Sequence, residues 1–395
     1  MAAYSLPKKL LHWYAVVAAA SVSLLICSGG LVTSHEAGMA VPDWPNTFGY
    51  NMFLFPVSRW VGGVFFEHTH RLIASTVGLL TVILCIALFV IESRRWVKTL
   101  GLIAVAAVIV QGILGGLRVT ENNAALGLFH GCLAQSFFAL MATIALVTSR
   151  FWERLEAGTV RTETANHLRH PVSLASSFAK ASDFAKASSD KSEDKGEAAL
   201  QKSPLNSHLA LLISCRRWVV AVTGMVFLQL VLGASMRHSH AGLSIPDFPL
   251  NYGHLFPPLD AASIDKINQA RGAAAQPYTS AWLILLQYGH RLWAVLIVAG
   301  LVFTSVRLLR NRFLPLFFRR CASVWILLVF VQFCLGAWTV LSNKAADVAT
   351  AHVFCGALTL MLGVLLAVSL SGLLHYSHKV LSHSSLSQGI ELGTV

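Results

Sequence analysis

Eight stretches of mostly apolar residues, each long enough to cross a lipid bilayer, constrain the fold of this chain more than any other feature. A bilayer core of roughly 30 Å needs about 20 apolar residues in an α-helix. Because backbone polar groups must be satisfied within the membrane, we expect each stretch to form one helix. The stretches cover residues 10–32, 65–91, 99–119, 125–149, 216–236, 282–306, 319–341 and 348–373.

The composition supports the same conclusion. Hydrophobic residues make up 55% of the 395 residues, charged residues only 12%, and the mean hydropathy is +0.63. These values exclude an ordinary soluble globular domain. We therefore predict an all-α polytopic membrane protein with eight transmembrane helices.

The net charge is +12, and the distribution of the basic residues indicates the orientation of these helices. Basic residues cluster near Lys8, around Arg94, across 150–217 and across 307–320, which are alternate loops and the amino terminus. Since Lys and Arg accumulate on the cytoplasmic side, both termini are predicted to be cytoplasmic, in the cell inner (plasma) membrane. Anionic lipid head groups, and not nucleic acid, are the expected partner of this charge.

The second half of the chain repeats the first. Three pairs of segments carry the repeat: THRLIAS at 69–75 with YGHRLWA at 288–294, HEAGMAVPDWP at 35–45 with SHAGLSIPDFP at 239–249, and QGILGGLRVT at 111–120 with QFCLGAWTVL at 332–341. An internal repeat indicates a duplicated structural unit. We predict two duplicated four-helix bundles in tandem, at residues 1–150 and 216–374.

The segments outside the bundles differ in character. Residues 151–215 are rich in Ser, Ala, Lys, Glu and Asp, which predicts a disordered cytoplasmic linker, and 375–395 is predicted to be a cytoplasmic tail. The outer loops carry VPDWP at 41–45 and IPDFP at 245–249, which favour caps over the bundle ends. Asp43 and Asp247 are candidates for capping turns or for binding a ligand. The second loop also has extra residues near 257–276 that have no assigned purpose.

The seven cysteines are scattered mainly through the apolar stretches, and neither outer loop contains a pair. An extracytoplasmic disulfide framework is therefore not expected. The chain also has no CxxCH motif, so any haem is expected to be held noncovalently.

Four of the 16 histidines lie at matched depths. His70, His130, His290 and His352 each follow the start of an even-numbered stretch by a few residues, so at about 1.5 Å per residue they are expected near the outer surface. Neighbouring helices can present two imidazoles to opposite faces of one haem. The sequence predicts two bis-histidine sites, His70 with His130 and His290 with His352. A hydrogen-bonded structural role is the alternative for any one histidine.

Arginines stand beside these histidines. Arg71 and Arg291 directly follow His70 and His290 and lie on the outer side, against the general charge bias. Their planar guanidinium groups match the carboxylates of haem propionates. Contact with lipid head groups is the alternative. Arg118, at the outer end of the third stretch, is a weaker candidate for the same role.

The repeat is broken three residues before the aligned histidines, where the first half has Glu67 and the second has Gln287. Residues i and i+3 share a helix face, so Glu67 is expected to address the same cavity as His70. A carboxyl group can transfer protons there, whereas an amide cannot. Glu67 is therefore the catalytic candidate, with a structural ion pair to a nearby arginine as the alternative.

The chain resembles the haem A synthase family, the CtaA and COX15 type of membrane enzyme, over nearly its whole length apart from the linker. The resemblance rests on GGLVTSHEAG at 29–38, EHTHR at 67–71, QGILGGLRVT at 111–120, FHG at 129–131, YGHR at 288–291 and AH at 351–352. Their order across a duplicated eight-helix frame makes the resemblance specific.

The resemblance implies oxidation of a ring methyl of haem O to a formyl group, which gives haem A for terminal oxidases. It implies that the first bundle receives the substrate haem, with His70 and His130 near its iron and Glu67 as the essential acid. His290 and His352 are then expected to hold haem b in the second bundle. A haem O synthase (protohaem farnesyltransferase) and the oxidase assembly machinery are the implied partners.

Three points qualify these expectations. Some family members carry a cysteine pair in the first outer loop, which this chain lacks between residues 33 and 66. A di-haem b-type membrane electron carrier is an alternative function, because it needs the same histidines. A haem-binding chaperone or transporter for oxidase assembly is the other alternative.

Overall fold

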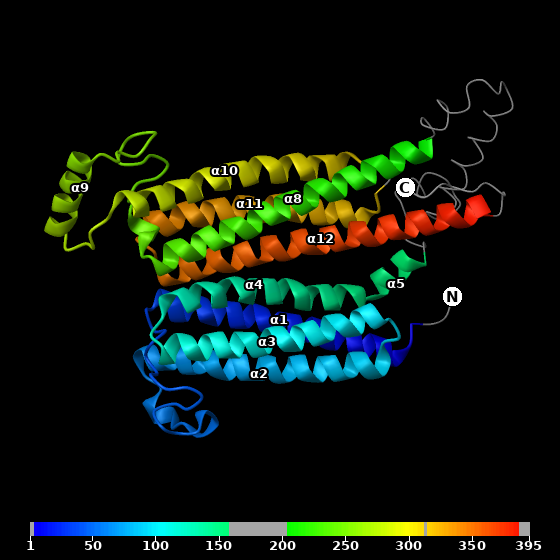
Figure 1. Cartoon of the computed structure of the whole chain (residues 1–395), viewed down its shortest axis with the longest axis horizontal. Helices are drawn as coiled ribbons and strands as arrows, with labels where there is room; N and C mark the ends of the chain where they lie inside the picture. The colour runs from blue at the N-terminus through cyan, green and yellow to red at the C-terminus, as the bar shows by residue number, and fades with distance from the viewer. Residues whose placement is uncertain (1–3, 158–203, 312–313, 387–395) are drawn as a thin grey trace. The chain divides into compact units, whose positions relative to one another are not determined.

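The computed structural model describes residues 4–157, 204–311 and 314–386, and Figure 1 shows their course. These residues form helices joined by loops. Within them, extended pairing is limited to two isolated bridges, Thr47 with Tyr50 and Asn251 with His254. The predicted all-α class is confirmed.

Eight of the helices are long and apolar enough to cross a membrane. Their bounds are α1 Leu6–Ser34, α2 Gly62–Ile91, α3 Arg95–Thr120, α4 Ala124–Val147, α8 Pro204–His238, α10 Ala281–Arg310, α11 Leu316–Leu341 and α12 Ala346–Leu386. Seven of them contain a predicted apolar stretch completely, and α4 ends two residues before the end of the stretch 125–149, so the prediction of a polytopic membrane protein is confirmed. We call the helix ends next to the loops 35–61 and 239–280 the outer ends.

Both ends of the predicted linker 151–215 are helical. α5, Arg150–Glu156, occupies its beginning, where Ser149 caps the helix by accepting a hydrogen bond from the Trp152 amide at 3.2 Å. α8 begins at Pro204, an arrangement that suits proline because the first turn of a helix needs no amide donor. The predicted boundaries are corrected accordingly. The remaining linker residues, 158–203, lie outside the described residues.

The last helix is also longer than expected. α12 continues to Leu386 and so enters the predicted tail, 375–395. No proline or glycine lies between Gly372 and Leu386, so nothing in the local chemistry ends the helix at 374.

The described chain divides into two compact units. The first comprises Met1–Ala145, Gly224–Ala299 and Leu327–Met361, and the second comprises Leu146–Thr223, Gly300–Ile326 and Leu362–Val395. The long helices α8, α10, α11 and α12 each contribute to both units, so these units differ from the predicted bundles. The division into two tandem bundles stays a prediction.

In the first unit, α1 to α4 pack against one another. The hydroxyl of Tyr14 on α1 donates to the carbonyl of Leu80 on α2 at 3.2 Å, and Nδ1 of His12 lies 3.0 Å from the carbonyl of Ala145 on α4. α2 and α3 approach closely at Gly101, because a Cβ there would lie 3.0 Å from Cδ1 of Leu88.

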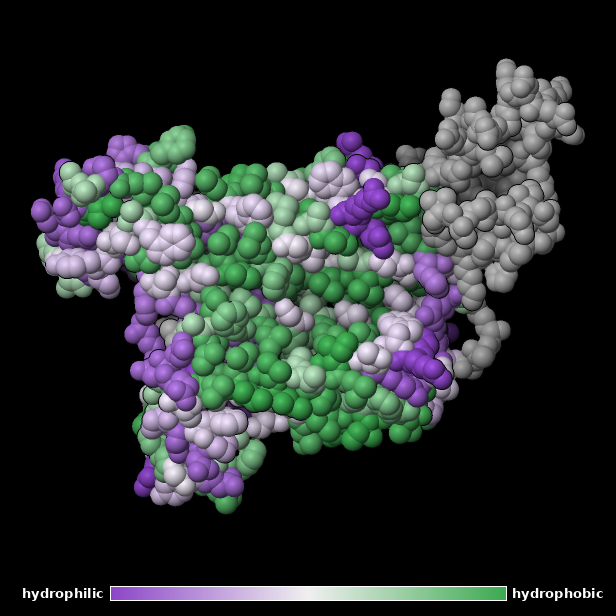
Figure 2. Space-filling model, in the orientation of Figure 1, coloured by the Kyte–Doolittle hydropathy of each residue, from purple (hydrophilic) through white to green (hydrophobic). Residues whose placement is uncertain are grey.

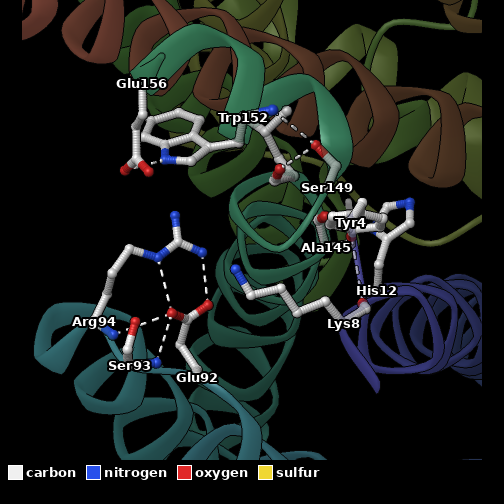
Figure 3. A network of polar contacts seen from close by, with 11 residues as sticks. Tyr4, Lys8, His12, Glu92, Ser93, Arg94, Ala145, Ser149, Trp152 and Glu156 are labelled. Carbon is white, nitrogen blue, oxygen red and sulfur yellow. Dashed lines mark hydrogen bonds and ion pairs between the residues drawn. The ribbon is translucent and has the colours of Figure 1, made fainter. Parts of the chain in front are cut away.

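A buried carboxylate holds the turn between α2 and α3 (Figure 3). Glu92 accepts hydrogen bonds from the amides of Ser93 at 2.9 Å and Arg94 at 3.0 Å, and its Oε2 lies 2.6 Å from Nη2 of Arg94. Burial alone would raise the pKa of Glu92. The hydrogen bonds and the charge of Arg94 outweigh it and hold that pKa below its ordinary value.

In the second unit, α5 packs on α12. A Cβ on Gly372 would lie 2.8 Å from Cη2 of Trp152 and 3.0 Å from Cδ2 of Leu155, so the glycine admits both side chains. The Trp152 indole donates to Glu156 at 2.8 Å (Figure 3). α5 is therefore a packed helix, in contrast to the flexible segment expected there.

The two outer loops share a turn built around an aspartate. Each carboxylate accepts two backbone N–H groups, those of Phe48 and Gly49 at 2.8 Å for Asp43, and those of Tyr252 and Gly253 at 2.7 and 2.8 Å for Asp247. Burial raises the pKa of both carboxyls, but these hydrogen bonds outweigh it and hold the pKa below its ordinary value. The predicted turn-capping role of both aspartates is confirmed.

The loops also contain short helices. These are 3₁₀ helices η1 Met52–Leu54, η2 Val57–Arg59 and η5 Ala241–Leu243, and the α-helix α9, Ala261–Ala273. α9 accounts for the extra segment near 257–276, and Asn268 ties it to Thr279 by hydrogen bonds of 3.0 and 2.8 Å. Figure 2 shows hydrophilic residues gathered over α9 and apolar residues over the long helices.

Candidate functional site

The four predicted histidines lie near the outer ends of four different helices. His70 is on α2, His130 on α4, His290 on α10 and His352 on α12. All four side chains are half-buried, and all four belong to the first unit. Within each predicted pair the imidazoles interact electrostatically, so the structure brings His70 near His130 and His290 near His352.

A glycine on a neighbouring helix faces each imidazole. A Cβ built on the glycine would lie 3.0 to 3.2 Å from the histidine Cε1, closer than ordinary packing allows. The four pairs are Gly29 with His70, Gly115 with His130, Gly233 with His290 and Gly336 with His352. A larger residue would displace the ring, so these glycines set the position of all four imidazoles.

Glutamines on α3 and α8 hold the backbone beside two of the histidines. Gln111 donates to the carbonyl of His130 at 3.1 Å, and Gln229 donates to the carbonyl of His290 at 3.0 Å. The Gln229 amide also lies 3.2 Å from Nε2 of His290. These contacts fix the helix segments that carry the rings.

Three of the imidazoles have a buried nitrogen without a partner. Among the described residues, Nδ1 of His130, His290 and His352 accepts or donates no hydrogen bond. Nδ1 of His70 lies 2.8 Å from Oγ of Ser28. A buried polar nitrogen without a partner is destabilising, and a metal ligated by the ring relieves that cost.

The arrangement fits haem iron better than a bare metal ion. In the described part of the chain, no group of three or more His, Cys, Asp or Glu side chains is placed to hold a metal. Protein-bound zinc takes three or four protein ligands, whereas a haem iron needs only two axial ones. Two imidazoles, each set against a glycine, meet that requirement at both sites.

Glu67 is buried and joins α2 to the first outer loop. Its Oε2 accepts the N–H of Val41 at 2.9 Å, and its Oε1 accepts a hydrogen bond from Arg71 at 2.8 Å. The residue is 4% exposed, and both of its carboxyl oxygens have a hydrogen-bond donor. The structure thus contains the ion pair that the sequence left as the alternative role of Glu67.

Gln287 makes the corresponding contact on α10 without a charge. Its Oε1 accepts the N–H of Ile245 at 2.6 Å, and its Nε2 donates to the carbonyls of Ile245 and Gly242 at 3.1 Å each. In the predicted repeat, Ile245 corresponds to Val41. Both side chains therefore hold the same point of their outer loop, and only Glu67 adds a negative charge.

Arg71 and Arg291 hold the outer loops. Each guanidinium donates to three loop carbonyls: those of Val41, Asp43 and Asn46 at 2.7 to 3.0 Å for Arg71, and those of Ile245, Asp247 and Leu250 at 2.9 to 3.3 Å for Arg291. Because the guanidinium donors of Arg71 and Arg291 already bind loop carbonyls, the structure does not support their predicted contact with haem propionates.

Arg118 differs from these two arginines. Its guanidinium makes no hydrogen bond to any residue that the structure describes, and a Cβ on Gly38 would overlap it. It interacts electrostatically with Glu67, His70 and His130. Arg118 is therefore a cation with free donors beside the first histidine pair.

Comparison with known proteins gives two kinds of match. Residues 197–364 match the COX15-CtaA family model, a cytochrome oxidase assembly protein. The chain is 31% identical over 137 residues to a heme A synthase of Alkalihalophilus pseudofirmus, and the aligned region covers 34% of this chain and 45% of that protein. It is 28% identical over 137 residues to a heme A synthase of Caulobacter vibrioides, and the aligned region covers 35% of this chain and 37% of that protein.

A third relative aligns over much more of the chain. The heme A synthase of Lysinibacillus sphaericus is 24% identical over 355 residues, which covers 87% of this chain and 90% of that protein. The alignments with the first two relatives span less than half of their length.

Proposed function

We propose that the chain is a haem A synthase of the COX15-CtaA family, because residues 197–364 match that family model and relatives named heme A synthase align over most of the chain. The proposed reaction oxidises a ring methyl of haem O to a formyl group and gives haem A for terminal oxidases. The observation that carries the proposal is the presence of two similar histidine sites of which only one has a buried carboxylate beside it.

We assign different tasks to the two sites. His70 and His130 hold the iron of the substrate haem O within the bundle 1–150, and His290 and His352 hold haem b within the bundle 216–374. The two bundles are then products of a tandem duplication. Haem supplies the redox chemistry, and the protein supplies binding, orientation and the local charges. The glycines opposite the imidazoles support this assignment, because they leave room for rings in a fixed position.

Glu67 handles protons in this proposal. Oxidation of a methyl to a formyl group breaks two C–H bonds and adds one oxygen atom. When water supplies that oxygen, the electrons pass to an external electron acceptor and the released protons need an acceptor close to the ring. Arg71 and the Val41 amide donate hydrogen bonds to Glu67, a carboxyl group can exchange protons, and Glu67 precedes His70 by three residues on the same helix. Gln287 cannot accept one, so the second site lacks this function.

The chain is a multi-pass membrane protein. We propose that it lies in the cell inner membrane with both termini in the cytoplasm, because basic residues cluster around the helix ends opposite the outer loops. A haem O synthase supplies the substrate in this scheme. The product passes to terminal oxidases during their assembly.

The mass of the pigments extracted from purified protein tests the proposal. A haem A synthase contains haem b together with haem O or its oxidised products, and it converts added haem O to haem A. Two bound haems b and no conversion would instead identify an electron carrier. Binding and release of haem of unchanged mass would identify a chaperone or transporter.

A further inference from the structure

The last two residues of α8, Arg237 and His238, contact helices α1 and α4. Nη2 of Arg237 donates to the carbonyl of Gly30 at 2.9 Å and to Oγ of Ser34 at 2.7 Å, both on α1. His238 follows at the last position of α8, and a Cβ on Gly127 of α4 would lie 2.5 Å from its Cε1. All these residues belong to the first unit.

Arg118 completes a cluster with these two residues. The same Gly127 Cβ would lie 3.2 Å from Nε of Arg118, so one glycine separates the arginine from His238. Arg118 interacts electrostatically with both Arg237 and His238. We call Arg118, Arg237 and His238 the outer cationic cluster.

No carboxylate of the described residues forms an ion pair with the outer cationic cluster, although Glu67 acts on Arg118 electrostatically. Among the residues that the structure describes, none of its three members forms an ion pair, and the nearby Glu67 is already paired with Arg71. Like charges at close range repel one another, and the repulsion is strongest away from water. Both arginines also keep guanidinium N–H groups without a partner among the described residues. An anion bound here would therefore relieve the repulsion and accept these donors.

The position of the cluster identifies the anion. Arg118 acts electrostatically on both His70 and His130, and His238 acts on His130, so the cluster borders the first histidine pair on its outer side. A haem carries its iron at the centre and two propionates along one edge. Iron held by the two imidazoles places those carboxylates within reach of cations at the edge of the site.

We propose that Arg118 and Arg237, with His238, bind the propionates of the haem held by His70 and His130, so that the last turn of α8 completes a site otherwise built from α1 to α4. This rests on the proposed function, because it takes that haem to be the substrate. The second site differs at the position of Arg118. In the repeat, Thr339 takes the place of Arg118, and its hydroxyl donates to its own helix at 2.7 Å.

The test compares haem O with its propionate dimethyl ester. Purified full-length protein is titrated with each pigment, and the change in absorbance gives the dissociation constant. Arg118→Gln and Arg237→Gln are each expected to weaken haem O binding by about 10- to 100-fold, the usual effect of losing a hydrogen bond to a charged group. Neither substitution should change binding of the ester. Arg237→Lys should restore part of the affinity.

Two controls separate this effect from others. Arg59→Gln removes an exposed cation in the first outer loop and should leave both dissociation constants unchanged. Unchanged binding of the ester also shows that a variant is folded. Equal losses for haem O and its ester, an equal loss in Arg59→Gln, or no loss in Arg237→Gln would each overturn the inference. Haem A formation measured in parallel tests the proposed function separately, because binding can depend on Arg237 whether or not the protein oxidises the pigment.

Discussion

The two histidine sites share one frame and differ in charge. In both, glycines face the imidazoles, and a side chain one turn before the arginine holds the outer loop through a backbone N–H. The first site adds Glu67, Arg118 and the end of α8, whereas the second has Gln287 and Thr339 at the corresponding places. The features shared by both sites can position a haem. We propose that the features found only at the first site make that haem react.

Gln287 shows that an amide is sufficient to hold the loop. It accepts the N–H of Ile245 and is 1% exposed, much as Glu67 accepts that of Val41. A buried ion pair is seldom the most stable choice where a neutral group fits. The carboxylate of Glu67 is therefore better explained by its charge than by the fold.

The largest expected effect is the loss of one haem per chain. His290→Ala and His352→Ala each remove a proposed axial ligand and should abolish binding of haem b, while His70→Ala and His130→Ala should leave it bound. The haem content of purified protein, with the pigment identified by mass, measures this. His375→Ala, at an exposed position of α12, is the matched control. Retention of haem b in both His290→Ala and His352→Ala would contradict the assignment of the second site.

The next largest expected effect is a difference in stability between variants of Arg71 and Arg291. Arg71→Leu leaves Glu67 buried without its partner and should reduce the free energy of unfolding by about 3 to 5 kcal/mol. Arg291→Leu removes hydrogen bonds to neutral groups and an electrostatic interaction with Asp247, but leaves no buried charge without a hydrogen-bonded partner, and should reduce it by about 1 to 3 kcal/mol. Thermal unfolding in detergent measures both. Adding Glu67→Gln to Arg71→Leu should restore part of the lost stability, and no recovery would show that the ion pair is not the cause.

Substitution of the glycines tests the shared frame. Gly115→Ala and Gly233→Ala place a methyl about 3.2 Å from a histidine ring and should cost about 1 to 3 kcal/mol of stability, with a shifted absorbance of the haem at that site. Gly112→Ala on α3 and Gly224→Ala on α8 are matched controls, because a Cβ there meets no atom within 4 Å. The idea fails if the controls shift the haem absorbance as much as the test variants do.

The smallest expected effect is a loss of outer-loop stability at low pH, and it is the same in both outer loops. The pKa values of Asp43 and Asp247 are lowered in the folded protein, so the stabilisation they provide is complete above the ordinary value of 3.8 and is lost as the pH falls through the lowered value. Limited proteolysis of the outer loops should therefore accelerate at pH below about 4 in both loops. Asp43→Asn and Asp247→Asn should each remove this pH dependence from its own loop.

Much of the fold could be predicted from the sequence because length and hydropathy determine membrane helices. The eight apolar stretches correspond to the eight long helices, and the turn-capping role of the two loop aspartates follows from local chemistry. The histidines could be selected because the repeat puts them at matched depths. These features depend on residues close together in the chain or on comparison of its two halves.

The rest depended on contacts between distant residues. Nothing in the sequence indicates that Arg71 reaches back to three carbonyls of the first outer loop, or that Arg237 lies against Gly30. The GG pairs at 29–30 and 115–116 were the available signal for the ring positions, but a glycine in a membrane helix has many uses. α5 was missed because its seven residues are too short to show a helical period.

The central claim is that the charge of Glu67 makes the first site the reacting one. The direct measurement is the rate of haem O conversion to haem A by purified Glu67→Gln protein, followed by pigment mass. Because Gln287 holds the second loop as an amide, the variant should fold, retain haem b and bind haem O. We predict conversion about 100-fold slower than in the wild type, or slower still, the usual effect of losing a proton-transfer group. Conversion at the wild-type rate would contradict the claim.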